Sequence, residues 1–401
     1  MTKQETRSRP RSPVQSLARS SAAKAMASVA LLAALSPDAF AVTGGPYGPY
    51  VGKLAGKDIV MLINAGDPTD GAAGNYFYRS IGMDITLFKA AGGKGQFIEC
   101  PATWGDEVCD KPSGYWSISF TDDAAKAQWR KTPSAKPLQV ELAKAPADTR
   151  PVAGTPAEDT PDRWTEALRV AGPTSTGKEE KSGFVRWHII TDKRSGVHMP
   201  VLTAAPNAAA MAKINATLKK DFDEQITSAL YAQARPSGDF EEENAVYFAN
   251  ERYFAIGGGA GGYSGGAHPS SGFGVRTYDL QTGSPVEFKH IYKVEPNANT
   301  AFNAKTDKSL VAQALKQYLD EGNTASDDND CWARVAERYQ CKDAQCTATG
   351  DNAYPQVFPT KDGLGIVLDI FSEAERPCRD EYRTLSWKDA SRALLKPGSF
   401  P

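Results

Sequence analysis

The sequence predicts an α+β protein, in which a small antiparallel β barrel or sandwich precedes a mixed α/β domain with an antiparallel sheet and two main helices. Three observations support this. Short alternating strands separated by Gly and Pro fill residues 46–145, a stretch of linker composition follows at 146–182, and two amphipathic helical patterns alternate with strands in 183–401. A length of 401 residues suits two domains after processing.

Residues 1–41 have the three parts of an export signal. A basic segment precedes the apolar run Ala25–Leu35, and Ala39-Phe40-Ala41 is a small-x-small cleavage site. The alternative is a disordered basic tail. Cleavage after Ala41 would place the mature chain in the periplasm or outside the cell. No later run reaches the roughly 18 apolar residues of a membrane helix, so no stable membrane insertion is expected.

The charge balance argues against one class of partner. Removing the presequence, with its six basic and two acidic residues, from the 46 basic and 48 acidic residues of the chain leaves a net charge of about −6. Nucleic-acid binding depends on clustered basic residues that neutralise phosphates. The mature chain is therefore not expected to bind nucleic acid, although it would tolerate a basic protein partner.

Six cysteines in an exported chain favour disulfides. Cys100 and Cys109 stand alone in the first half and are expected to pair. The other four allow three connectivities, of which we favour Cys341–Cys346 and Cys331–Cys378. A zinc site is the alternative, but no C-x-x-C and no nearby His support it. Neither a metal nor another cofactor is expected.

The β module is predicted from strands that end at turn residues. Its strand candidates are residues 57–63, 74–79, 84–87, 96–99, 114–120 and 138–142. Residues 146–182 are rich in Pro, Ala, Thr and Gly and are expected to form a linker, although Trp164–Val170 could pack on a domain.

The second domain is predicted from helical and strand periodicity. A long helix is expected over 207–230 with Asn207 as its cap, and a second helix over 309–319. Strands are expected at 184–190, 245–249, 252–256, 275–280 and 365–371, the second and third forming a hairpin.

The most unusual segment is the glycine-rich run Gly257–Pro269, which formally contains two catalytic patterns. Gly257-x-Gly259-x-x-Gly262 matches a dinucleotide fingerprint, and Gly262-Tyr263-Ser264-Gly265-Gly266 matches the G-x-S-x-G nucleophile elbow. Both need a helix directly afterwards. Here Gly265, Gly266 and Pro269 oppose a helix, which argues against a nucleotide site and against a serine hydrolase.

The same segment carries a family resemblance. Tyr263-Ser264-Gly265-Gly266-Ala267-His268, followed by Val275–Gly283, resembles the Y-[ST]-G-G-A-H … Y-x-[FY]-D-L-x-T-G core of an extracellular domain. This domain occurs in lysozyme-sensing anti-sigma factors and beside some peptidoglycan deacetylase domains. Met199–Leu218 is similar to the "YP … IN" helix that precedes the core. The resemblance covers about residues 183–395 and implies an α/β domain that binds rather than cleaves, with lysozyme as the ligand in the anti-sigma factors.

The chain departs from that family in two respects. It shows no transmembrane helix and no sigma-binding segment, so sigma-factor control is not carried over, and its second domain holds four additional Cys. The expected function is therefore a secreted envelope binding protein that binds or inhibits lysozyme, binds a peptidoglycan-related ligand or senses cell-wall stress. The alternative is a cell-wall hydrolase or esterase that uses Ser264 or an unassigned carboxylate pair.

The residues expected to bind are Tyr263, Ser264, Gly265, Gly266 and His268. Tyr263 would serve as an aromatic anchor. In a purely structural role, Tyr263 and His268 would instead hydrogen-bond inward and lock the turn. Glu241-Glu242-Glu243 is interpreted as the charged face of a loop, and Asp327–Asp330 as a helix cap before Cys331.

Overall fold

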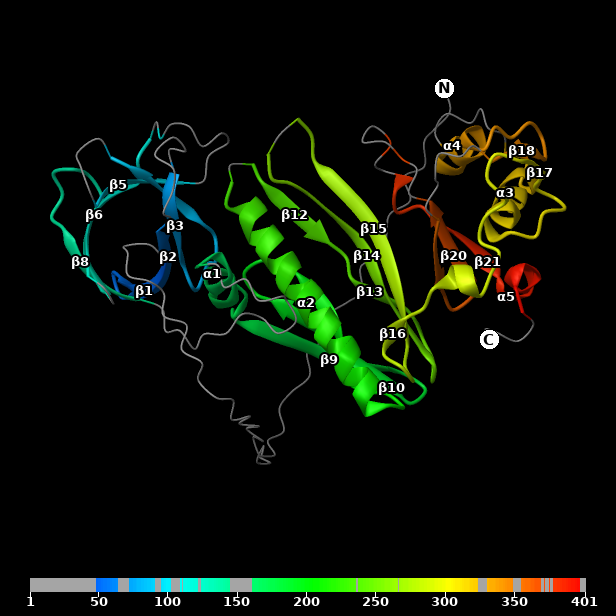
Figure 1. Ribbon diagram of the computed structural model, residues 1–401, viewed down its shortest axis with the longest axis horizontal. Helices are drawn as coiled ribbons and strands as arrows, with labels where there is room; N and C mark the ends of the chain where they lie inside the picture. The colour runs from blue at the N-terminus through cyan, green and yellow to red at the C-terminus, as the bar shows by residue number, and fades with distance from the viewer. Residues whose placement is uncertain are drawn as a thin grey trace, which may run out of the picture. The chain divides into compact units, whose positions relative to one another are not determined.

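The computed structural model has an α+β fold with a closed barrel at its N-terminal end (Figure 1). It describes residues 48–63, 72–90, 95–101, 109, 111–121, 124–144, 161–235, 237–265, 267–323, 330–348, 355–368, 371, 375 and 378–396. The predicted signal segment and its cleavage site lie outside these residues.

Eight antiparallel strands, each paired with the next, form the barrel, and β1 closes it by pairing with β8. The strands are β1 (Gly48–Leu54), β2 (Lys57–Ile63), β3 (Ala72–Tyr78), β4 (Ile85–Lys89), β5 (Gln96–Pro101), β6 (Gly114–Phe120), β7 (Ala124–Arg130) and β8 (Leu138–Lys144). The sequence predicted either a barrel or a sandwich for this segment, and the structure shows a barrel. Closure removes the exposed edges that an open sheet of this length would carry.

Alternate residues of every strand point inward and fill the barrel. They include Tyr50, Met61, Leu87, Trp116 and Val140, each at most 2% exposed. Glu99 lies among these side chains with only 5% of its surface exposed. Its carboxylate accepts hydrogen bonds from hydroxyl and indole groups, namely Tyr76 Oη (2.7 Å), Ser113 Oγ (2.7 Å), Trp116 Nε1 (3.3 Å) and Trp129 Nε1 (2.6 Å). These donors replace the water that a buried carboxylate loses.

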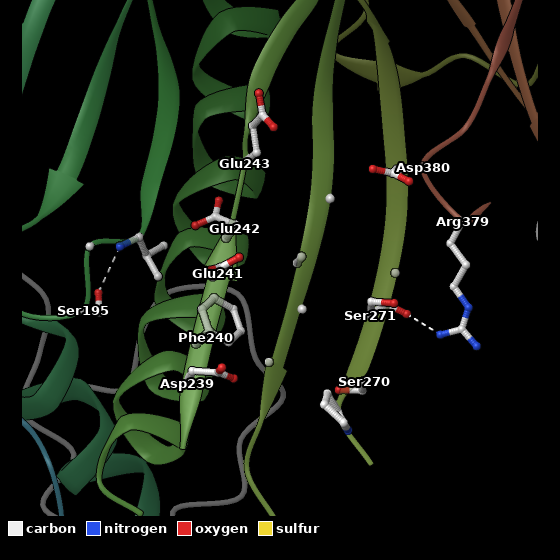
Figure 2. A pocket seen from close by; sticks show the side chains of 18 residues that line it. Ser195, Asp239, Phe240, Glu241, Glu242, Glu243, Ser270, Ser271, Arg379 and Asp380 are labelled. Atoms are coloured by element: carbon white, nitrogen blue, oxygen red, sulfur yellow. Dashed lines mark hydrogen bonds between the residues drawn. The ribbon is translucent and has the colours of Figure 1, made fainter. Parts of the chain in front are cut away.

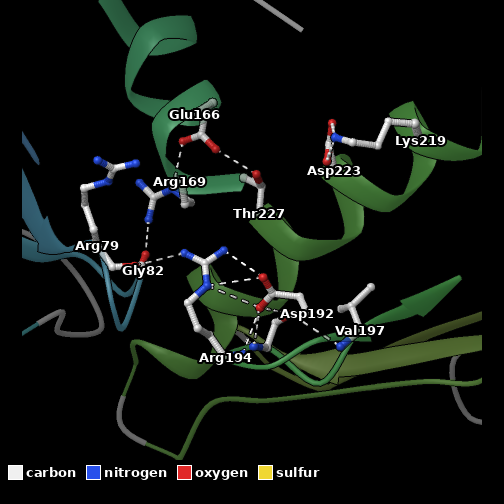
Figure 3. A network of polar contacts seen from close by, with 11 residues as sticks. Arg79, Gly82, Glu166, Arg169, Asp192, Arg194, Val197, Lys219, Asp223 and Thr227 are labelled. Atoms are coloured by element: carbon white, nitrogen blue, oxygen red, sulfur yellow. Dashed lines mark hydrogen bonds and ion pairs between the residues drawn. The ribbon is translucent and has the colours of Figure 1, made fainter. Parts of the chain in front are cut away.

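Helix α1 (Pro161–Val170) contacts the outside of β1 and β2, which explains why β2 is apolar on both faces. Arg169 on α1 is 3% exposed and forms a bidentate ion pair with Asp84, at 2.9 and 3.0 Å. It also donates to the carbonyl oxygen of Gly82 (Figure 3) and lies over the ring of Phe77.

The expected linker over 146–182 is therefore wrong for residues 161–182, which form α1 and strand β9 (Thr174–Ser182). Composition was misleading, because the short apolar stretch inside that segment is enough to make a packed helix. The packing of residues from Trp164 to Val170 on a domain is confirmed by buried Thr165 and Arg169.

A long helix and two sheets form a second hydrophobic core. One sheet has the strand order β11–β10–β9, with β10 (Val185–Asp192) and β11 (His198–Ala204). The other has the order β12–β14–β15–β16, with β12 (Asp239–Glu242), β14 (Tyr253–Tyr263), β15 (Ser270–Asp279) and β16 (Ser284–Pro285), and β13 (Ala245–Ala249) also pairs with β14. Helix α2 (Ala208–Gln233) buries Ile214, Leu218, Phe222 and Ile226 in this core, and Asn207 caps it as predicted.

The C-terminal part has its own core. Helices α3 (Leu310–Asp320), α4 (Cys331–Arg338) and α5 (Trp387–Ala390) contribute to it together with β19 (Pro355–Pro359), β20 (Gly363–Leu368) and β21 (Arg383–Ser386). Strands β17 (Ala301–Asn303) and β18 (Gln345–Thr347) form a small separate ladder, and the 3₁₀ turns η1 (Phe288–His290) and η3 (Ser391–Ala393) also belong to this part. Asp330 caps α4 by accepting from the N–H of Trp332, which confirms the expected capping role for this residue, while residues 327–329 of the same cluster lie outside the described residues.

The cysteines pair as favoured from the sequence: Cys100–Cys109, Cys331–Cys378 and Cys341–Cys346. Three disulfides and no reduced thiol among the described residues fit an extracellular or periplasmic protein. Among the same residues, no helix has the length and apolar character needed to cross a bilayer.

Candidate functional site

A groove of about 920 Å³ runs along the sheet β12–β14–β15 (Figure 2). One wall is formed by β12 and the turn before β11, the floor by the glycine-rich halves of β14 and β15, and the other wall by Arg379 and Asp380. The dimensions are those of a site for a ligand or for a protruding segment of a partner.

The groove is acidic. Asp239, Glu241, Glu242, Glu243 and Asp380 line it, whereas Arg379 is the one basic side chain among its lining residues. Arg379 is held by carbonyl oxygens: its guanidinium donates to Ser271 O at 2.6 Å and to Phe371 O at 3.2 and 3.4 Å. A ligand in this groove therefore meets a negative field, which favours cationic groups.

Glu242 is the most perturbed of these acids. Burial raises the pKa of its carboxyl to about 7, and the bond from the backbone N–H of His198 to Oε2, at 3.3 Å, only partly opposes this. Its other oxygen, Oε1, is buried and has no hydrogen-bond partner among the described residues. This carboxyl is thus able to accept a further donor or to exchange a proton near neutral pH.

The glycines of the floor are of two kinds. A Cβ on Gly257 would lie 1.9 Å from the carbonyl oxygen of Gly274, and one on Gly262 would lie 2.4 Å from that of Asp239. Neighbouring strands approach too closely there for a side chain. By contrast, a Cβ on Gly272 would meet nothing within 4 Å, so that glycine leaves open space above the sheet.

The predicted binding segment is the tip of the β14–β15 hairpin. Tyr263 ends β14 and its N–H donates to Asp239 Oδ1, while Ser264 and His268 are exposed in the connecting loop. Gly265 has φ +115°, a conformation that favours glycine, and Gly266 lies outside the described residues. The structure therefore brings the tip to one end of the acidic groove. Ser264 and His268 are exposed, whereas side chains that hydrogen-bond inward to hold the turn would be buried.

The strand β15 follows the loop where a nucleophile elbow or a dinucleotide site requires a helix. This agrees with the sequence argument against both motifs. The interpretation of Glu241-Glu242-Glu243 as a loop is wrong for Glu241 and Glu242, which belong to β12 and pair with Gly261 and Ala260. Consecutive charges gave no strand signal, so sequence reasoning missed the acidic wall, although the four acids among residues 239–243 could have indicated it.

No family model matches the chain, and no curated protein matches it either. Among the described residues, no group of three or more His, Cys, Asp or Glu side chains is arranged to hold a metal ion.

Proposed function

We propose that the chain is an envelope binding protein whose acidic groove receives a cationic protein. Lysozyme is the partner class implied by the resemblance of the β14–β15 hairpin. The observation that carries the proposal is the negative charge of the groove. Five carboxylates line it, and the single guanidinium among its lining residues is already bonded to carbonyl oxygens.

The shape of the site supports binding of a protruding segment. The hairpin tip, with Tyr263 and His268, lies at the end of the groove, and Gly272 leaves open space above the floor where a partner can approach the backbone. Tyrosine is enriched at protein interfaces and among the residues that contribute most to binding, so Tyr263 suits the role of an anchor.

The proposal predicts an electrostatic interaction that can be measured directly. Binding of a c-type lysozyme, followed by calorimetry and by inhibition of its lytic activity, should occur at micromolar concentration or below and should weaken as salt rises. Replacing the exposed acids Glu241, Glu243 and Asp380 with their amides should weaken binding by about tenfold or more.

A matched control changes the same number of charges elsewhere. Glu141, Glu251 and Asp362 are exposed and do not line the groove, so their triple amide variant should bind like the wild type. Equal loss in both variants would mean that only net charge matters, and no binding by the wild type would remove lysozyme as the partner.

The raised pKa of Glu242 favours a second candidate function, a carboxylate-dependent cell-wall hydrolase. A carboxyl whose pKa is near 7 is suited to act as a general acid. In that case purified protein would degrade peptidoglycan, and Glu242→Gln would abolish the activity without weakening binding to the polymer. Absence of any peptidoglycan cleavage by the wild type would exclude this candidate.

A further inference from the structure

One edge of strand β15 is not hydrogen-bonded to another strand over most of its length, although β19 packs beside it. Along its whole length β15 pairs with β14 on one side, but on the other side β16 pairs only with Tyr278 and Asp279. Within the described residues, the stretch from Ser271 to Val275 thus presents its outward N–H and C=O groups to side chains rather than to a ladder. An edge of this kind is a template for an additional strand.

Two side chains occupy this edge. The amide of Gln356, on β19, accepts from the N–H of Val275 at 3.3 Å and donates to the C=O of Phe273 at 3.2 Å. Arg379 donates to the C=O of Ser271. One residue of an added strand offers the same donor and acceptor as the Gln356 amide, so the side chain stands where a peptide backbone would bind.

A small cavity lies beside this edge. It has a volume of about 260 Å³ and is lined by Ser271, Gly272, Phe273, Gln356, Val367 and Arg379. It shares the lining residues Ser271, Gly272 and Arg379 with the acidic groove, so the two spaces adjoin at these residues. The hydroxyl oxygen of Ser271 is buried there and has no hydrogen-bond partner among the described residues, which is unfavourable unless a ligand supplies one.

We propose that an extended segment of the partner adds to the edge of β15 at Ser271–Val275 as a further strand and displaces the amide of Gln356. This deepens the proposed function and rests on it. The occupant is a polypeptide with basic side chains, because the edge opens into a groove that carries five carboxylates. Side chains of the added strand would find room over Gly272, where the sheet has no side chain of its own.

Backbone recognition separates this mode from docking by charge alone. Val275→Pro removes the outward N–H, which belongs to the uncovered edge and not to the β14 ladder. We expect this change to weaken partner binding about tenfold, whereas Val275→Thr, which keeps the N–H, should bind like the wild type. Gln356→Ala should tighten binding severalfold because it removes the competing amide, and Gln139→Ala on the barrel, an exposed amide, is its control.

Hydrogen exchange on the full wild-type chain provides the decisive measurement, and it does not depend on a variant that folds. Two probes are used, a c-type lysozyme and an end-capped heptapeptide of alternating lysine and valine. Each should slow amide exchange at Phe273 and Val275, and N-methylation of alternate peptide amides should abolish the effect of the heptapeptide.

The outcomes distinguish the two proposals. Lysozyme that binds without protecting these amides would overturn strand addition and leave the proposed function standing. Protection by the heptapeptide without binding of lysozyme would support strand addition and overturn lysozyme as the partner. Absence of binding by both probes would overturn both proposals.

Discussion

The indole nitrogen of Trp129 lies 2.6 Å from Oε2 of Glu99, inside a closed barrel whose other inward side chains are mostly apolar. The contact depends on Gly114, because a Cβ there would lie 2.5 Å from Trp129 Nε1 and 2.7 Å from Glu99 Oε2. The absence of a side chain at Gly114 on β6 therefore allows the carboxylate of Glu99 on the neighbouring strand β5 to be buried and hydrogen-bonded.

Glu99→Gln should lower the free energy of unfolding by about 2–4 kcal/mol. The amide removes the charge that strengthens these hydrogen bonds and turns a donor toward groups that themselves donate. Urea unfolding followed by tryptophan fluorescence measures the loss, since Trp116 and Trp129 both contact the carboxylate. Glu141→Gln, at an exposed site on β8, is the control and should change stability by less than about 0.5 kcal/mol. An equal, small effect of both substitutions would contradict a structural role for Glu99.

Gly257 and Gly272 are predicted to respond oppositely to alanine. At Gly257 the new Cβ would overlap the backbone of β15, so the strands must separate, and we expect a loss of about 2–4 kcal/mol. At Gly272 the space is open, and Gly272→Ala should leave stability unchanged or raise it by up to about 1 kcal/mol. Thermal and denaturant unfolding of the two variants tests this. Similar destabilisation by both would mean that the groove floor is not open at Gly272.

Local patterns predicted the elements whose own residues determine them. The spacing of Ile214, Leu218 and Phe222 indicated α2, Asn207 marked its start, and alternation in residues 114–120 indicated β6. Strand β7, Ala124–Arg130, was missed because its inward residues Ala125 and Ala127 are small and give little hydrophobic contrast. Strand β9 was missed because it is exposed along almost its whole length and reads as a polar loop.

The candidate site was harder to predict because its parts meet only through tertiary pairing. The hairpin tip was found from its glycines, but the acidic wall faces it through the register that pairs Glu242 with Ala260. Likewise, no sequence signal links Gln356 to Phe273 and Val275, which are about 80 residues away along the chain. Such contacts follow from how the two sheets pack and not from local propensity.

Glu242 should make both stability and binding depend on pH. Its pKa is raised in the folded state from 4.5 to about 7, so the native protein holds this proton more tightly than the unfolded chain does. The resulting stabilisation is fully present below about pH 4.5 and is lost as pH rises through 7. Relative to Glu242→Gln, the wild type should therefore lose about 1–2 kcal/mol between pH 5 and pH 8, a value reduced for partial exposure.

Binding of a cationic partner should show the opposite trend with pH. The charged carboxylate attracts the partner, so affinity should rise between pH 5 and pH 8 in the wild type and should be nearly flat in Glu242→Gln. Calorimetry at several pH values measures both variants. A parallel rise in the two would assign the dependence to other groups.

The two C-terminal disulfides should contribute unequally to stability. Cys331–Cys378 joins residues 47 apart, whereas Cys341–Cys346 joins residues 5 apart. A cross-link stabilises largely by restricting the unfolded chain, and the restriction grows with the length of the closed loop, so we expect about 4 kcal/mol from the long loop and about 2 kcal/mol from the short one. Double serine variants of each pair, compared by denaturant unfolding under oxidising conditions, give the two values.

Because Cys331 begins α4 and Cys378 directly precedes the groove residue Arg379, loss of the long-loop disulfide should also weaken partner binding, while loss of Cys341–Cys346 should not. Equal destabilisation by the two double variants would show that native-state packing, not chain entropy, sets their contribution.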